Sequence, residues 1–226
     1  FTDVVENIDF ENYEDGTELS ESDLAELGFS LKSQFGGVVP RAVVKDVSYK
    51  TSGSSKMLCL EIKKDTPFEL KKNINSPERN GVKPIRADVE YIYMHNDTVQ
   101  DSAKDADKFK KRISYNPFGQ ISAANKVFTN PAMNAGSLYS NSYITSSGGN
   151  GYFSYTVWNR VKYAFDYSAD KFSGGFIVDP EREGWGGSFY MKFKETTVDS
   201  AIPQTISWKT DRFSELNEDA VSYLYL

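Results

Sequence analysis

Short stretches in which apolar and polar residues alternate dominate this chain. The clearest stretch spans residues 151–167, where Phe, Tyr and Val occupy every second position along most of its length. Residues 56–64 alternate in the same way, and residues 85–95 place Ala, Val, Tyr and His on one face. A period of two is typical of β-strands that bury one face. The pattern therefore predicts strands in all three stretches.

The other expected elements are shorter. Ser20–Gly28 indicates a helix, with Ser20 as the N-cap, Asp23 three residues later and Gly28 as the C-cap glycine. One or two amphipathic turns could also lie within residues 103–113. Seven further segments predict strands: Asn7–Tyr13, Phe29–Lys32, Ala42–Tyr49, Gly175–Asp179, Gly187–Lys194, Gln204–Thr210 and Ala220–Leu226. Nine or ten short strands with one or two short helices predict an all-β fold, a jelly-roll or lectin-like β-sandwich of two antiparallel sheets.

The pattern shows no boundary between two cores. Residues 137–151 are rich in Ser, Gly and Asn, but the segments on either side are too short and one-sided to bury cores alone. We therefore expect one β-sandwich domain over residues 1–226, with 137–151 as a loop. The last predicted strand reaches the final residue without a cap or turn. This suggests that the C-terminal end is truncated.

Composition and charge narrow the partners. With 26 Lys and Arg against 32 Asp and Glu, the net charge is −6, which argues against nucleic acid or an anionic membrane. One Cys and one His exclude an intramolecular disulfide, multi-Cys metal sites and His clusters. No apolar run exceeds four residues, so we expect no membrane insertion, and no signal-peptide core is present.

Few residues fit a catalytic role. The only imidazole, His95, ends a predicted strand beside tyrosines, and we interpret it as a packing residue. A nucleophile elbow and a phosphate-binding loop are both missing from the sequence. Two carboxylate pairs have the spacing that β-sandwich glycosidases use, Asp88 with Glu90 and Glu181 with Glu183. A glycosidase, or a lyase that uses Tyr and Lys, therefore remains an alternative.

Aromatic side chains give the strongest indication of a ligand. Trp158 and Tyr190 lie on the polar faces of their predicted strands, and Trp185 lies in a loop flanked by glycines. Exposed indole and phenol rings can stack on the C–H faces of sugars at little entropic cost. A second core layer, or a plug at the end of the sandwich, would bury the indoles instead. Trp208 shares a face with Ile206, and we interpret it as a core residue.

Polar side chains near these rings are candidates for binding sugar hydroxyls. Arg160 and Lys192 share the polar faces, whereas Asn159 has the opposite parity and would need a bulge or a strand end. Lys162 and Lys194 add further positive charge, which leaves an acidic polysaccharide as another possible ligand.

Acidic residues in predicted turns could bind a metal ion. Asp9, Glu11, Glu14 and Asp15 lie close together in the sequence, and further aspartates lie within residues 97–107. Carboxylates and carbonyls are typical Ca²⁺ ligands, but neither group has EF-hand spacing. A single structural Ca²⁺ near Glu11 is one interpretation, and solvated turn acids are the other.

Two segments resemble a known family. Ile8–Thr17, with its Asp-Phe-Glu, Tyr and Asp-Gly, resembles the opening strand of concanavalin A-like jelly-roll domains in secreted bacterial proteins. Ser52–Leu60 is similar to a strand of the same domains, and Val221–Leu226 is similar to their closing strand. The resemblance implies a carbohydrate-binding module attached to a glycan-degrading or cell-surface protein, and a structural Ca²⁺ for which Glu11 is the matching position. Acidic, Tyr-rich surface proteins of gut Firmicutes are similar in composition.

These observations lead to one functional expectation with two alternatives. We expect a non-catalytic, monomeric module of a larger secreted or cell-surface bacterial protein, which binds a neutral glucan of the starch or plant cell-wall type. Trp158, Trp185 and Tyr190 would stack on sugar rings, with a loop around Tyr139–Tyr143 closing over the glycan. The alternatives are a polysaccharide-cleaving enzyme on the same scaffold and a protein-adhesion module.

Overall fold

Two antiparallel sheets make up most of the structure, which is a computed structural model. It describes residues 3–34, 36–47, 56–63, 66–97, 120–123, 126–128, 142–144, 150–152, 159–178, 191–192, 195–209 and 221–226. Within these ranges α1 (Glu21–Glu26) is the single α-helix, and strands form the rest of the regular structure. No helix in the described ranges has the length and apolar character needed to cross a bilayer.

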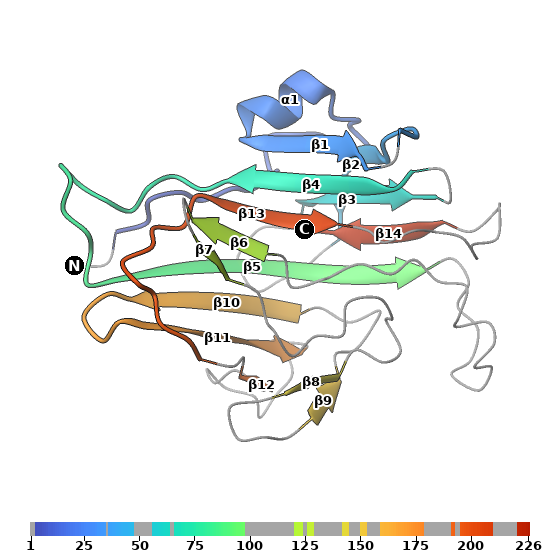
Figure 1. Cartoon of the computed structure of the whole chain (residues 1–226). Coiled ribbons are helices and arrows are strands. Elements are labelled where there is room, and N and C mark those ends of the chain that lie inside the picture. Colours follow the sequence, from blue (N-terminus) through green and yellow to red (C-terminus); the bar gives the residue numbers. More distant parts are fainter. Residues whose placement is uncertain are drawn as a thin grey trace.

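The sheets differ in size. The smaller one has the spatial order β1 (Phe29–Ser33), β4 (Phe68–Asn73), β13 (Thr205–Lys209), β6 (Gln120–Ala123), β7 (Lys126–Phe128). The larger one has the order β12 (Met191–Lys192), β11 (Lys171–Val178), β10 (Asn159–Asp166), β5 (Arg86–Asp97), β14 (Ser222–Tyr225), β3 (Lys56–Ile62), β2 (Arg41–Asp46). A separate pair consists of β8 (Ser142–Ile144) and β9 (Asn150–Tyr152). In Figure 1 α1 lies at the top above β1, and β8 and β9 lie at the bottom. The all-β sandwich prediction is confirmed.

Aromatic side chains from both sheets fill the core between them. The ring of Tyr91 on β5 meets that of Trp208 on β13 edge to face, with centroids 5.3 Å apart. Tyr163 on β10 stacks on Phe172 on β11 at 5.8 Å. Burying such a side chain stabilises the fold by about 1.5–3 kcal/mol. Trp208 is 3% exposed, which confirms its interpretation as a core residue.

Most of the predicted strands are present. The runs at 29–32, 42–49, 56–64, 85–95, 204–210 and 220–226 correspond to β1, β2, β3, β5, β13 and β14. β10 covers the second half of the 151–167 run, and β11 begins earlier than predicted, at Lys171. Two residues of the predicted strand at 187–194 form β12, and residues 103–113 lie outside the described ranges. The side chain of His95 is also outside them, although the register pairs its backbone with Leu224.

The predicted strand Asn7–Tyr13 is wrong, because this segment spans the edge between the sheets. At one end, Glu6 accepts hydrogen bonds from Lys72 Nζ at 2.6 Å and from the Asn75 N–H at 3.1 Å, both next to the smaller sheet. At the other end, the Gly16 N–H donates to the Val44 carbonyl of the larger sheet at 2.8 Å. A segment that crosses between two edges cannot pair with one strand along its length.

The predicted helix is confirmed with both of its caps. Ser20 and Asp23 form a capping box, in which the Ser20 N–H donates to the Asp23 carboxylate at 2.7 Å and the Asp23 N–H donates to Ser20 Oγ at 3.2 Å. The hydrogen bond from the Ser20 side chain lowers the pKa of Asp23 below its usual value. The helix ends with Leu27 as its C-cap, and Gly28 follows directly at φ +77°, a conformation that suits glycine.

Candidate functional site

The larger sheet has a second face, which points away from the core and is called the outer face here. On β5 this face carries Asp88 and Glu90. The core residues Tyr91 and Tyr93 have the opposite strand parity and belong to the other face. The register places Lys162 on β10 opposite Glu90. Strand partners share a face, so the side chains of β5 and β10 form one continuous row on the outer face.

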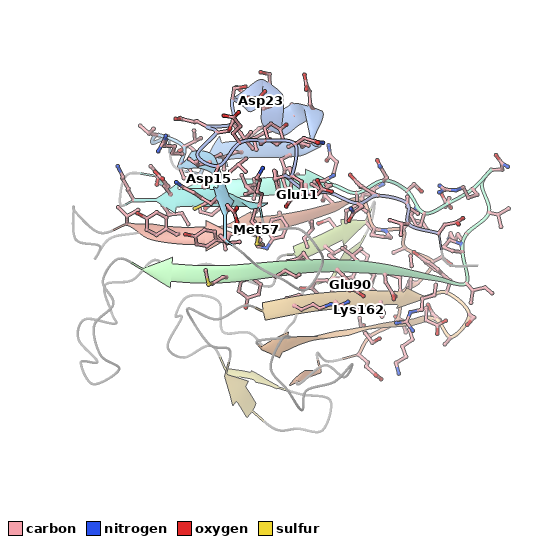
Figure 2. All side chains as sticks on the ribbon, turned by 180° about the vertical axis from the view of Figure 1, so that it is seen from behind. Glu11, Asp15, Asp23, Met57, Glu90 and Lys162 are labelled. Carbon is pink, nitrogen blue, oxygen red and sulfur yellow. The ribbon has the colours of Figure 1, made fainter. Side chains whose placement is uncertain are left out.

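Charged side chains of β5 and β10 form a connected network on this face. Lys162 Nζ lies 2.6 Å from Asp88 Oδ2 and 2.9 Å from Glu90 Oε1. Arg160 Nη2 lies 2.6 Å from Glu90 Oε2, and Arg86 Nε lies 2.7 Å from Asp88 Oδ1. Figure 2 shows Glu90 and Lys162 close together on neighbouring strands. These five residues, Arg86, Asp88, Glu90, Arg160 and Lys162, are called the charge ladder below.

The charge ladder keeps Glu90 ionised. Partial burial alone would raise the pKa of Glu90, but the hydrogen bonds from Lys162 and Arg160 outweigh this effect, and the pKa is lowered. Lys162 shows the matching behaviour, because the hydrogen bonds that it donates to Asp88 and Glu90 outweigh its desolvation and raise its pKa. Glu90 and Lys162 therefore keep their charges near neutral pH, and each side chain of the ladder faces an opposite charge.

The carboxylate pair Asp88 and Glu90 is close enough for both groups to contact one ammonium. Glycosidases need one carboxyl with a raised pKa as the general acid. The pKa of Glu90 moves in the opposite direction. The second pair from the sequence, Glu181 and Glu183, lies outside the described residues.

Two tyrosines on the final strand extend the outer face beyond the ladder. The register aligns Tyr225 on β14 with Met94 on one side and Cys59 on the other, and Tyr223 lies on the same face two residues earlier. Their ring centroids are 6.5 Å apart with an interplanar angle of 31°. Both side chains are half-buried. These two rings were not among the site residues predicted from the sequence, although their period-two spacing is visible in it.

Tyr225 lies partly buried beside Cys59 of the neighbouring strand β3. Burial, together with a hydrogen bond shared with Cys59, raises the pKa of Tyr225 to about 12. Burial also raises the pKa of the Cys59 thiol to about 12. Both groups are therefore uncharged near neutral pH. This part of the outer face offers an apolar, aromatic surface next to the charged one.

The structure brings some of the predicted site residues together. Arg160 belongs to the charge ladder, and the backbone register places Lys192 on β12 in one row with Gly175, Lys162 and Glu90. In the backbone register Asn159 pairs with Tyr93 and Val178. It therefore has the opposite strand parity to Arg160, as the sequence predicted. The three predicted stacking residues, Trp158, Trp185 and Tyr190, lie outside the described residues, as does Tyr139 in the predicted closing loop.

Glu11, the predicted Ca²⁺ ligand, lies beside a lysine. Its carboxylate accepts a hydrogen bond from the Lys56 N–H at 2.9 Å. Lys56 Nζ donates to the carbonyl oxygens of Glu11 at 3.1 Å and Tyr13 at 2.6 Å. Carbonyls and a carboxylate are suitable Ca²⁺ ligands, but here they already surround an ammonium. Among the described side chains, no cluster of three or more His, Cys, Asp or Glu residues could hold a metal ion. A Ca²⁺ ion at Glu11 stays a prediction, and it would have to displace Lys56.

Comparisons with known proteins give a structural similarity but no family. No protein-family model matches the chain, and no curated protein matches it. A solved structure described as a sialidase is similar, with a TM-score of 0.41 and 9% sequence identity. The match covers 93% of this chain and 18% of the sialidase chain, so this chain spans less than a fifth of that protein's length.

Proposed function

We propose that this chain is a non-catalytic carbohydrate-binding domain that holds a polysaccharide on the outer face of its larger sheet. The observation that carries the proposal is the Tyr223–Tyr225 pair, which lies on the same sheet face as the charge ladder. Aromatic rings can cover the C–H faces of successive sugar units, and charged groups can bind the hydroxyls at their edges. A strip of rings beside a row of donors and acceptors provides both.

The balance of charge favours a neutral glycan. Each cation of the ladder lies within 3 Å of a carboxylate oxygen, so the positive charge is locally compensated. An acidic polysaccharide would need cations that are not already matched in this way. We therefore infer a neutral glucan of the starch or plant cell-wall type.

The residues predicted from the sequence extend this site in the proposal. Trp158 stands two positions before Arg160, and Tyr190 two positions before Lys192, so each shares the strand parity of an outer-face position. Trp158, Tyr190 and Trp185 would add further stacking rings, while Lys192 and Asn159 would contribute hydrogen bonds. The proposed setting is a monomeric module of a larger bacterial protein, secreted or at the cell surface.

The two alternatives have less support. A polysaccharide-cleaving enzyme could use Asp88 and Glu90, but the lowered pKa of Glu90 does not suit a general acid. A protein-adhesion module would use the same tyrosines as an interface, but the charge ladder would then have to be desolvated, which is costly for charged groups.

Affinity electrophoresis tests the proposal. Wild-type protein would be run in gels containing amylopectin, glycogen, pullulan, xylan, mixed-linkage β-glucan, pectin or alginate. We expect one neutral glucan to retard the wild type, and Tyr223→Ala to abolish or greatly reduce that retardation. Arg160→Gln should weaken it, because a charged hydrogen bond contributes about 1.5–3 kcal/mol. Trp158→Ala and Trp185→Ala test the sequence-predicted rings in the same gels.

Matched controls separate binding from folding. Tyr223→Phe keeps the ring and should retain binding. Lys209→Gln removes a cation that pairs with Glu69 at 2.7 Å on the smaller sheet, and should leave binding unchanged. Retardation only by pectin or alginate would contradict the neutral-glucan proposal. If no polysaccharide retarded the wild type, the carbohydrate-binding proposal would be wrong. Release of reducing sugar, abolished by Glu90→Gln, would show an enzyme instead.

A further inference from the structure

A cleft lies in a different place, at one end of the β-sandwich. It has a volume of about 600 Å³, within the range of small-molecule sites. Its walls are the connection from β4 to β5 and the segment that leads into β13. It shares no lining residue with the charge ladder or the tyrosine pair of the outer face.

Hydrogen bonds fix the two walls relative to each other. The Ile74 N–H donates to the Gln204 carbonyl at 2.8 Å, where the walls meet. Lys83 Nζ donates to the Ser200 carbonyl at 2.8 Å and joins the far ends of the two segments. The Tyr167 hydroxyl, from the turn after β10, donates to the Ala201 carbonyl at 3.1 Å. The cleft is therefore preorganised, which lowers the entropic cost of binding.

One wall contains two consecutive residues in the left-handed backbone conformation. Asp199 and Ser200 have φ values of +50° and +60°, and the Ala201 N–H closes this turn on the Val198 carbonyl at 3.0 Å. Asp tolerates this left-handed conformation, whereas Ser adopts it at a cost. Strained residues of this kind often occur where a ligand is held. The Asp199 N–H donates to Asp170 Oδ1 at 2.8 Å, which adds a second hydrogen bond that supports this turn.

The lining combines apolar and polar groups. Ile74, Ile202 and Pro203 provide apolar surface, while Ser76, Gln204 and Thr205 provide uncharged donors and acceptors. The lining also includes one carboxylate, Glu78, and one ammonium, Lys83. A site with balanced charge, an apolar wall and several uncharged hydrogen-bonding groups matches a neutral polyhydroxylated ligand.

We propose that this end cleft is a second saccharide site, which binds one or two units of a neutral glycan independently of the outer face. The class of ligand, a neutral glycan, rests on the proposed function. The location of this second site does not. Thr205 would bind a sugar hydroxyl, Glu78 would accept hydrogen bonds from one or two more, and Ile202 would contact the C–H face. Two sites on one module would raise the affinity for a long polysaccharide through multivalency.

Calorimetry and NMR with short neutral saccharides test this inference. Wild-type chain would be titrated with maltotriose, cellotriose, xylotriose and a mixed-linkage trisaccharide, and amide shifts would be followed in ¹⁵N spectra. We expect one trisaccharide to shift the amides of the non-proline residues within 74–78 and 200–205. Glu78→Gln and Thr205→Val should each lower its affinity by about tenfold, since each removes hydrogen bonds to the sugar. Glu69→Gln, on the smaller sheet, is the matched control, and thermal melts would confirm that all variants fold.

The outcomes distinguish this inference from the proposed function. If polysaccharide binding depends on Tyr223 but both cleft variants bind every trisaccharide and polymer like wild type, the cleft inference is wrong and the outer-face proposal stands. If the cleft variants lose trisaccharide binding while Tyr223→Ala binds polymers normally, the cleft is the saccharide site and the outer-face proposal is wrong. If no trisaccharide shifts any amide, the cleft inference is wrong, and if no polysaccharide retards the wild type either, both are overturned.

Discussion

Lys72 and Lys162 each point from a strand toward carboxylates, but they lie in different surroundings. Lys72 occupies the last position of the core-facing row of β4, after Phe68 and Leu70, and its side chain is 9% exposed. Its ammonium donates to Glu6 and to the Asn73 carbonyl and lies 5.7 Å from the centre of the Phe29 ring. Lys162 lies on the outer face with 22% of its side chain exposed, between two carboxylates.

The difference shows how burial determines the role of an ion pair. A buried charge that loses its partner keeps its desolvation cost, so Lys72 and Glu6 mainly affect folding. A partly exposed network contributes little to stability because water screens it, but its groups can exchange partners with a ligand. We therefore expect changes at Lys72 to alter stability, and changes at the charge ladder to alter binding.

The largest expected effect is that of Glu6→Ala. It leaves the Lys72 ammonium without a carboxylate in an almost buried position. We expect a loss of about 2 kcal/mol in the free energy of unfolding, below the roughly 3–5 kcal/mol of a fully buried pair, because the Glu6 side chain is 25% exposed. Urea denaturation measures this loss.

Lys72→Met supplies the control for that experiment. It removes the buried charge and keeps an apolar chain against Phe29, so its stability should stay within about 1 kcal/mol of wild type. The double variant should be more stable than Glu6→Ala alone. If the double variant were as unstable as Glu6→Ala, the loss would come from the N-terminal segment itself and not from an unpaired ammonium.

A substitution at Gly28 tests the surroundings of Lys72 in a second way, because Gly28 lies against the Lys72 side chain. A Cβ at this position would be 2.8 Å from Lys72 Nζ, and the φ of +77° disfavours any other residue. We expect Gly28→Ala to cost about 1–2 kcal/mol from the left-handed backbone, with a small addition from moving the ammonium. Gly16→Ala is the control, since its φ is +85° but its Cβ would meet nothing within 4 Å. Equal losses of stability in the two variants would show that the contact with Lys72 contributes nothing.

The position of Lys72 also shows why the sequence predicted some strands and missed others. Alternation indicated most strands and the sandwich, because strands with three or more apolar residues on one face carry a strong signal. β4 was missed because its core-facing row ends in Lys72, so only Phe68 and Leu70 mark it, directly after Pro67. The segment 7–13 was predicted as a strand because Ile8 and Phe10 alternate. They do pack against the core, but from a segment that crosses between the sheets.

The candidate site was harder to predict than the fold. Parity placed Arg160 and Lys162 on a polar face, and the structure shows that the same face carries Asp88 and Glu90 as their partners. Which strands are neighbours depends on pairing between distant segments, and the sequence pattern does not contain this information. Tyr223 lies on that face only because β14 inserts between β3 and β5.

A smaller effect is expected at the charge ladder. The pKa of Glu90 is lowered in the folded state, so its stabilising contribution is present above the unfolded value of about 4.3 and disappears as the pH falls through the folded pKa. Glu90→Gln should therefore cost less than about 1 kcal/mol at pH 7 and nothing near pH 2. Urea midpoints at pH 7, 5, 3 and 2 measure this. If Glu90→Gln were instead more stable than the wild type at pH 7, the pKa of Glu90 would be raised in the folded state, which would favour the enzyme alternative.

The smallest expected effect concerns a third lysine, Lys56. Its ammonium is held by the carbonyls of Glu11 and Tyr13, the oxygens that a Ca²⁺ ion at Glu11 would also use. Because these oxygens already face a cation, we expect millimolar Ca²⁺ to leave the melting temperature of the wild type unchanged to within about 1 °C. Lys56→Met removes the ammonium and keeps the chain length, so Ca²⁺ should stabilise this variant more than the wild type. A rise of several degrees in the wild type would instead support a resident Ca²⁺ and show that Lys56 yields its position to the metal.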